Sequence, residues 1–337
     1  QYRKVLSRSV SQFINRWRKT ETQLHLEDAL PCHLLQKLNP EKFSSNPFFR
    51  KPDFRYDSFQ QFEAILIDHA LEFFHSPESY YEVAKVIFEN HLEQNVKYVE
   101  TSFHAGMIEY LKVPGDEILK AILAAVPSGL EVRVYLGMSR NLYTEYLGPK
   151  LEDAISSWSE LAGIDLHGLE SLPLESWTAP FWHRAKECGK IVKAHAGEFG
   201  SAKNVLHAIK QLGVQRIQHG TKSIECEEVM AVVKDNDVSF DMCPISNYKL
   251  RVIENWQDHP LPHFLAENIS CTLSTDDPFS FNNSLPEEYQ VCYEKLGLGL
   301  PELARLAGNG FKHADLDKGS KDLWLSKIQN LLSNFSK

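Results

Sequence analysis

The stretch KIVKAHAGEFGSAKNVLHAIKQLGVQRIQHG, residues 190–220, places a helical pattern between two short strand patterns. KIVKAHA and RIQHG carry short apolar runs, whereas SAKNVLHAIKQLG repeats its apolar side chains every three or four positions, as amphipathic helices do. A strand, a helix and a second strand in this order predict two parallel strands joined by a crossover helix.

The same alternation extends along most of the chain. Strand patterns occur at residues 22–26, 96–103, 132–138, 163–168, 190–196, 216–220, 238–244 and 270–275. Helical stretches such as 179–189 and 226–237 separate the later ones. Eight strand–helix units predict an α/β protein built as one (β/α)8 TIM barrel over residues 1–337, with extra helices at the termini.

The segment between the first and second predicted strands is too long for a simple crossover. It contains the Pro- and aromatic-rich residues 40–59 and a helical stretch at 60–74. An insertion after a barrel strand lies at the carboxyl-terminal mouth, so residues 38–75 are predicted to form a lid over a substrate. Packing on the protein surface is the alternative. The lid would include the aromatic side chains Phe48, Phe49 and Phe54.

The first twenty residues are basic and contain no acidic side chain. We expect an N-terminal helix that docks on the domain, and a targeting segment or a membrane-surface helix is the alternative. The docking side chains would be Val5, Val10, Phe13, Ile14 and Trp17.

Composition excludes several classes of protein. The formal charge of −9 argues against nucleic acids and anionic membranes as partners, because binding to either depends on basic side chains. Six scattered cysteines without a CxxC pair predict reduced thiols and a cytoplasmic location. No apolar run reaches the length of about 18 residues expected of a membrane span.

Metal-binding and acidic side chains follow four of the predicted strands. They are His25 and Glu27 after the first strand, His195 and Glu198 after the fifth, His219 at the end of the sixth, and Asp276 and Asp277 after the eighth. The carboxyl ends of barrel strands meet at one mouth, so we expect these groups to converge. Imidazole and carboxylate together are typical ligands of catalytic zinc, which ionises a bound water near pH ~7.

Eight segments, in order, resemble the markers of the adenosine deaminase family of metal-dependent amidohydrolases. They are LHLEDAL (24–30), YVETSF (98–103), GIDLHGLE (163–170), KAHAGE (193–198), RIQHGTK (216–222), DMCPISN (241–247), TLSTDDP (272–278) and LPELARLAGNGFKHA (300–314). The likeness covers nearly the whole chain from about residue 21 to 320. It implies hydrolytic loss of ammonia from a 6-aminopurine.

The resemblance also implies a role for each matching residue. His25, His195 and Asp276 would bind one divalent metal ion, most naturally zinc, and Asp276 would also belong to the catalytic group. Glu198 would protonate the ring nitrogen beside the attacked carbon, and His219 would orient the metal-bound water and help to deprotonate it. An aromatic ring carrying an amine resists hydroxide unless the ring is protonated during the attack, so these roles are chemically consistent.

Three further residues would contact the substrate. The resemblance implies that Asp277 bonds to purine N7, that the backbone of Gly168 bonds to N3, and that Glu27 contacts the sugar or the far end of the ring. Adenosine, adenine, a 5′-modified adenosine and aminodeoxyfutalosine all remain open as substrates, and the sequence does not indicate an oligomeric state.

Two positions in the first motif depart from the family pattern. Gln23 stands where the family has its first histidine, and a neutral amide oxygen is a weaker zinc ligand than imidazole. Three ligands suffice in many catalytic zinc sites, so we expect a weakened but present metal site, with the Gln23 oxygen or a water completing it. Asp28 replaces a glycine and is expected to be a surface-loop carboxylate, with added charge near the site as the alternative.

Other functions remain open on the same residues. Gln23 and Asp28 also fit a non-catalytic or metal-impaired purine-binding protein on a deaminase barrel, and a different amidohydrolase reaction is a third hypothesis. His104, after the second strand, is expected to be either a substrate contact or a loop residue.

Overall fold

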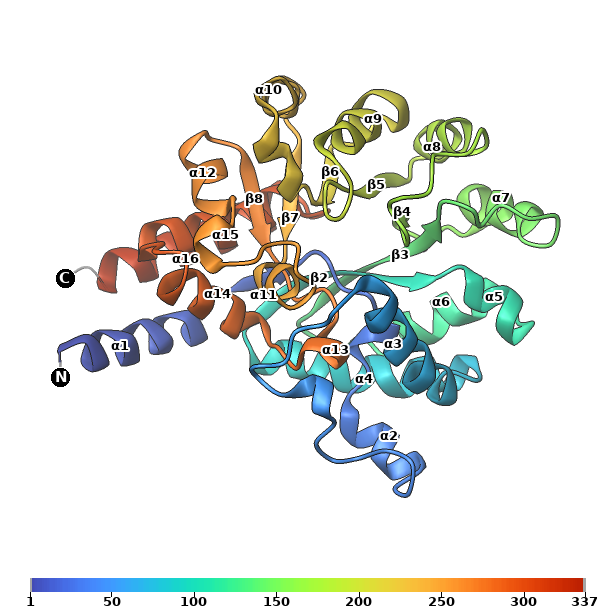
Figure 1. The fold of residues 1–337 in the computed structure, drawn as a ribbon, viewed down its shortest axis with the longest axis horizontal. Helices are drawn as coiled ribbons and strands as arrows, with labels where there is room; N and C mark the ends of the chain where they lie inside the picture. The colour runs from blue at the N-terminus through green and yellow to red at the C-terminus, as the bar shows by residue number, and fades with distance from the viewer. Residues whose placement is uncertain (1, 336–337) are drawn as a thin grey trace.

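Eight parallel strands form a single sheet in which each strand pairs with its neighbours in chain order (Figure 1). The computed structural model describes the backbone of residues 2–335 and the side chains of residues 8–335. The strands are β1 (Lys19–Glu21), β2 (Val96–His104), β3 (Glu131–Ser139), β4 (Gly163–His167), β5 (Ile191–Ala196), β6 (Arg216–His219), β7 (Ser239–Met242) and β8 (Ser270–Leu273). One parallel bridge between Leu24 and Asp276 joins the two ends of the sheet. The predicted (β/α)8 barrel is therefore confirmed.

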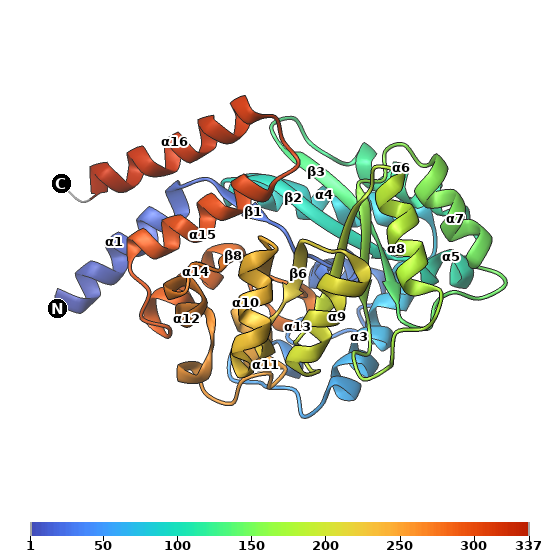
Figure 2. The same ribbon diagram turned by 90° about the horizontal axis from the view of Figure 1, so that it is seen from above.

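Helices surround the sheet, as the view from above shows (Figure 2). Before β2 lie α1 (Tyr2–Arg16), α2 (Cys32–Leu38), α3 (Phe59–Phe73) and α4 (Pro77–Glu93). The crossovers from β2 to β8 contain α5 (Gly106–Leu111), α6 (Gly115–Ala124), α7 (Gly148–Ser157), α8 (Thr178–Glu187), α9 (Ala202–Leu212), α10 (Glu227–Asp235), α11 (Pro244–Lys249) and α12 (Leu261–Ala266). After β8 come α13 (Pro278–Phe281), α14 (Leu285–Glu294), α15 (Leu300–His313) and α16 (Lys318–Phe335).

The first strand differs from its prediction. Regular pairing covers Lys19–Glu21, and beyond it Leu24 and His25 pair with the sheet only through isolated bridges. The strand is interrupted because the backbone N–H groups of Thr22 and Gln23 donate to the Ser274 hydroxyl, at 2.9 and 3.0 Å, instead of to a neighbouring strand.

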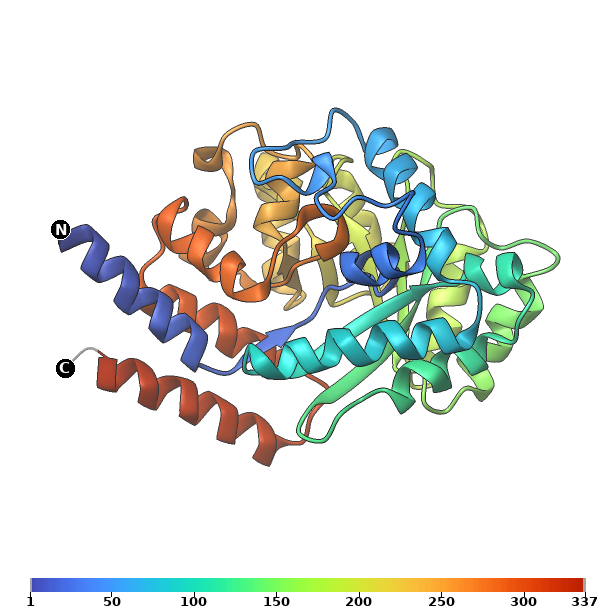
Figure 3. The same cartoon turned by 90° about the horizontal axis from the view of Figure 1, so that it is seen from below.

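The two terminal helices project from the same end of the barrel (Figure 3). The ring of Phe13 on α1 lies 5.0 Å from that of Phe335 on α16. Four side chains predicted to dock are buried, namely Val10, Phe13, Ile14 and Trp17, so the docking prediction is confirmed for them. Val5 lies outside the side chains that the structure describes. Within residues 2–335, every helix is too short or too polar to cross a bilayer.

The long segment after β1 reaches the carboxyl ends of the strands through α3. Ser58 caps this helix by accepting a hydrogen bond from the N–H of Gln61. Phe48, Phe49 and Phe54 do not line the central cavity and instead pack on one another, with Phe49 also against Phe279. The helix, rather than the aromatic loop before it, therefore borders the mouth.

The barrel interior beneath the mouth holds a buried ionic network that the sequence did not indicate. Glu100 on β2 contacts Lys193 on β5 and accepts a 2.9 Å hydrogen bond from Arg216 on β6. Arg216 also donates to both carboxylate oxygens of Asp241 on β7, at 2.9 and 3.0 Å. Two cations and two carboxylates thus balance one another across the barrel, below the predicted site.

Candidate active site

A cavity of about 320 Å³ opens at the carboxyl ends of the strands. It is lined by all of the site residues predicted above, namely His25, Glu27, Gly168, His195, Glu198, His219, Asp276 and Asp277. One wall is apolar and comes from α3, with Phe59, Phe62, Leu66 and Ala70. The barrel therefore brings together residues that lie as far as 252 positions apart in the chain, namely His25 and Asp277.

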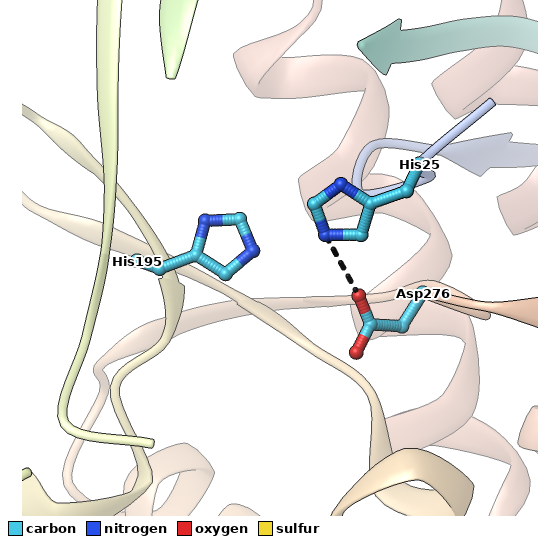
Figure 4. Close-up of side chains that lie close together, drawn as sticks. All are labelled: His25, His195 and Asp276. Carbon is cyan, nitrogen blue, oxygen red and sulfur yellow. Dashed lines mark ion pairs between the residues drawn. The ribbon is translucent and has the colours of Figure 1, made fainter. Parts of the chain in front are cut away.

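His25, His195 and Asp276 point toward a common centre (Figure 4). Each offers one ligand atom, and these atoms lie within 4.8 Å of one another. The His25 Nε2 atom is 3.4 Å from Asp276 Oδ1. Zinc binds imidazole nitrogen and carboxylate oxygen at roughly 2.0–2.2 Å, so two ligands of one ion stand at about this separation. The donor set and its spacing fit a divalent cation.

Neighbouring groups fix the orientation of these ligands. His195 Nδ1 donates to the backbone oxygen of Leu166 at 2.9 Å and lies 3.3 Å from Asp165, which leaves the Nε2 lone pair facing the centre. Ser246 donates to Asp276 Oδ2 at 2.8 Å. Asp276 also has a positive φ of 68°, a conformation that costs energy for a residue with a side chain and is found preferentially at functional sites.

Gln23 faces the same centre. Its Nε2 atom lies 3.0 Å from His25 Nε2, 2.9 Å from His195 Nε2 and 3.0 Å from Asp276 Oδ1. The side chain is almost fully buried. The amide nitrogen thus contacts one ligand atom from each of the three candidate metal-binding residues.

Glu198 and His219 lie next to the ligand cluster. His219 Nε2 is 3.1 Å from Glu198 Oε2 and 3.5 Å from Asp276 Oδ2. Burial and the nearby Asp276 carboxylate raise the pKa of Glu198 well above its ordinary value. Burial lowers the pKa of His219 to about 4. Both shifts favour the uncharged forms, the carboxyl of Glu198 and the neutral imidazole of His219.

A hydrogen-bonded chain fixes the tautomer of His219. The N–H of Leu261 donates to His259 Nδ1 at 3.1 Å, so the His259 proton is on Nε2, which donates to Asn247 Oδ1 at 3.0 Å. The Asn247 amide then donates to His219 Nδ1 at 3.2 Å. His219 consequently presents an N–H toward the cavity, which suits holding an oxygen atom in place. Sequence reasoning missed Asn247 and His259.

Asp28 is not a surface-loop carboxylate, and this expectation was wrong. The short 3-10 helix Glu27–Ala29 turns back into the mouth, where Asp28 is buried, lines the cavity and lies 3.9 Å from His104 Nε2. Burial, with Asp276 and Asp28 nearby, raises the pKa of Asp277 well above its usual range. The shift favours the neutral carboxyl of Asp277, which is the form that can donate a hydrogen bond.

The far wall of the cavity is formed by Glu27, His104 and His167. Glu27 accepts hydrogen bonds from the Tyr80 hydroxyl at 3.1 Å and from the N–H of His104 at 3.0 Å. His104 is the last residue of β2 rather than a loop residue, and its Nδ1 atom lies 3.1 Å from His167 Nε2. Both imidazoles line the cavity.

Glu170 holds the loop that carries Glu198, a function that sequence reasoning missed. Its carboxylate accepts hydrogen bonds from the N–H groups of Gly197, Glu198 and Phe199 at 2.9–3.0 Å, and from Asn204 Nδ2 at 2.7 Å. The only available indication was its position at the end of the GIDLHGLE segment.

A closed parallel barrel with imidazoles and carboxylates gathered at its mouth has the arrangement of metal-dependent hydrolases. The family model for adenosine deaminase matches residues 39–331. The chain therefore belongs to the adenosine deaminase family. The matched range begins after the segment that contains Gln23 and His25.

Curated relatives and solved structures agree with this assignment. Adenine deaminase of Zymomonas mobilis is 25% identical over 336 residues, with 96% of this chain and 98% of that protein covered. The crystal structure of adenine deaminase from Arthrobacter aurescens has the same fold, with a TM-score of 0.84, 22% identity and coverage of 94% and 99%. A zinc-bound amidohydrolase from Burkholderia ambifaria gives a TM-score of 0.85, 20% identity and coverage of 97% and 95%.

Proposed function

We propose that this protein catalyses the hydrolytic deamination of a 6-aminopurine, with release of ammonia, using one divalent metal ion. The observation that supports this most directly is the convergence of His25, His195 and Asp276 beside Glu198, whose raised pKa favours the protonated carboxyl. Membership of the adenosine deaminase family and similarity to adenine deaminases support the same reaction.

The metal ion is proposed to be zinc, held by His25, His195 and Asp276. The two imidazoles and one carboxylate are typical zinc ligands, and a structural neighbour is described as zinc-bound. When bound, such an ion supplies a Lewis acid that lowers the pKa of water from about 15.7 to about 7.

The remaining groups are proposed to act on the purine and the attacking oxygen. Glu198 donates its proton to the ring nitrogen beside the attacked carbon, so that negative charge does not accumulate on the ring. The His219 N–H holds the attacking oxygen. The neutral carboxyl of Asp277 donates to N7, and the backbone N–H of Gly168 donates to N3.

The substrate is proposed to be an uncharged aminopurine. Among the described residues that line the cavity, none is lysine or arginine. The pKa of His104 is raised to about 9, but its charge is already opposed by the carboxylates of Glu27 and Asp28, at 3.8 and 3.9 Å, so a phosphate would meet no free cation. Adenine, adenosine and an apolar 5′-modified adenosine fit this condition, whereas nucleotides do not. Helix α3 is proposed to act as the lid, because its apolar side chains border the cavity.

A second candidate is a purine-binding protein without catalytic turnover. The contacts of the Gln23 amide with all three ligand atoms favour it, because they compete with a metal ion. Both candidates are proposed to act on small molecules in the cytoplasm, without nucleic-acid or membrane partners.

The test is ammonia release from adenine, adenosine, 5′-modified adenosines, aminodeoxyfutalosine and AMP by zinc-supplemented protein. We expect turnover of an uncharged purine and a loss of about 10²–10⁴-fold in Glu198→Gln, with purine binding retained. Glu228→Gln on the exposed face of α10 serves as the control. Full activity in Glu198→Gln would contradict the assigned proton donor. Purine binding without turnover in zinc-loaded wild-type protein would select the second candidate.

A further inference from the structure

Gln23 is anchored so that only its amide group is free to turn. Its backbone N–H donates to the Ser274 hydroxyl at 3.0 Å, and its backbone oxygen accepts from the N–H of Asp276 at 3.1 Å. The side chain is only 2% exposed and ends at the centre of the ligand cluster. The remaining freedom that matters is rotation of the terminal amide about the Cγ–Cδ bond, which exchanges the positions of nitrogen and oxygen.

The present orientation of the amide conflicts with metal binding. An amide nitrogen carries two hydrogens, so it can donate in only two of its three contacts, here to Asp276 Oδ1 and to the Nε2 lone pair of neutral His195. Nδ1 of His195 donates to the Leu166 carbonyl, so in the neutral imidazole, which is the form that binds a metal ion, Nε2 is an acceptor. A lone pair that accepts a hydrogen bond is not available to a cation.

The opposite orientation favours a cation. After a half turn, the amide oxygen faces the Asp276 carboxylate and the Nε2 lone pair of neutral His195, and this arrangement is repulsive unless a positive ion lies between them. With an ion present, the same oxygen becomes a neutral fourth ligand. The two orientations therefore correspond to two exclusive uses of the same three side chains.

We propose that the Gln23 amide competes with the metal ion for the ligand atoms of the site. Its N–H groups hold the ligand cluster together until a divalent cation displaces them. The inference rests on the proposed function, since it concerns the regulation of that site. It makes the metal weakly held and exchangeable, so that cation supply controls activity. Because an amide oxygen is a harder donor than imidazole, it also shifts the preference from zinc toward harder ions such as Mn²⁺.

The test uses the full chain, stripped with a chelator, in wild-type, Gln23→His and Gln23→Glu forms. Affinities for Zn²⁺ and Mn²⁺ are measured by competition with a chelating dye, and the Tm of each stripped protein is recorded. Glutamate has the shape of glutamine but has no amide hydrogens, so we expect Gln23→Glu to bind Zn²⁺ at least about tenfold more tightly and to melt lower without metal. Gln23→His should gain roughly 10–100-fold in Zn²⁺ affinity and lose relative preference for Mn²⁺. Gln215→His, on an exposed position, controls for added surface imidazole.

Zn²⁺ affinities of both variants within threefold of wild type would overturn the proposal, as would a stripped Gln23→Glu protein as stable as wild type. The metal-affinity test of Gln23 and the ammonia-release test of the proposed function can fail independently of each other. Shifted affinities without ammonia release from any aminopurine would support the Gln23 proposal and reject the deaminase. Ammonia release with unshifted affinities would do the reverse.

Discussion

Glu170 offers the sharpest test of how the structure positions the proposed proton donor. One carboxylate oxygen accepts from Gly197 N–H at 2.9 Å and from Asn204 Nδ2 at 2.7 Å. The other accepts from the N–H groups of Glu198 and Phe199, both at 3.0 Å. In Glu170→Gln, one of these oxygens becomes an NH₂ group, so two of the four donors lose their acceptor whichever way the amide is turned.

The expected loss follows from these two broken contacts. A hydrogen bond to a charged group contributes about 1.5–3 kcal/mol, so Glu170→Gln should lower the free energy of unfolding by roughly 3–6 kcal/mol. Unfolding entropy scales with chain length at about 2.1 cal/mol/K per residue, which gives a Tm decrease of roughly 4–8 °C for this chain. Loss of alignment at Glu198 should lower kcat by about 10–100-fold while KM changes little.

The pH dependence supplies an independent check. Burial alone would raise the pKa of Glu170, but the hydrogen bonds from Asn204 and the loop N–H groups lower it below its ordinary value. A lowered folded-state pKa stabilises the protein above the unfolded value of about 4.3, and this contribution is lost as pH falls toward the folded pKa. The stability difference between wild type and Glu170→Gln should therefore be full at neutral pH and shrink below about pH 4.

Urea and thermal unfolding measure the stability, and ammonia release measures kcat and KM. Glu225→Gln, an exposed acidic residue, is the matched control. A Tm within 1 °C of wild type together with kcat within twofold would refute the reasoning, because it would mean that the loop keeps its position without the carboxylate.

Two further predictions concern buried carboxyl groups. Glu100→Gln leaves Lys193 and Arg216 short of negative charge inside the barrel. The free energy of unfolding, measured with urea at pH 7, should therefore fall by about 3–5 kcal/mol. A decrease below 1 kcal/mol would contradict a stabilising role of the network. Burial raises the pKa of Glu100, but Arg216 and Lys193 lower it to about 2, so the stability that this group contributes should be present above about pH 4.3 and lost as pH falls toward 2. Asp277→Asn keeps a hydrogen-bond donor of the same shape and should retain activity within about tenfold of wild type. Asp277→Ala removes the donor and should lower activity about 10²-fold. Equal losses of activity in the two variants would show that the carboxyl acts as an anion.

The sequence predicted most of the barrel because its information is local. The alternation of apolar strands and amphipathic helices is visible over short windows, and seven of the eight strands lie where it places them. The first strand was displaced because Ser274, far away in the chain, binds the backbone of Thr22 and Gln23. The misplacement of Asp28 has a similar origin, since nothing in LHLEDAL indicates that its turn folds back into the mouth.

The sequence by itself determined the fold class and eight of the residues at the mouth, because parallel strands in a closed barrel direct their carboxyl ends to one face. It did not place Asp28 and His167 there. Only the tertiary structure decided which of these groups carry protons, which imidazole nitrogen faces the cavity, and that the Gln23 amide touches three ligand atoms at once. Those properties depend on burial and on contacts between distant segments, and neither is encoded in a local pattern of residues.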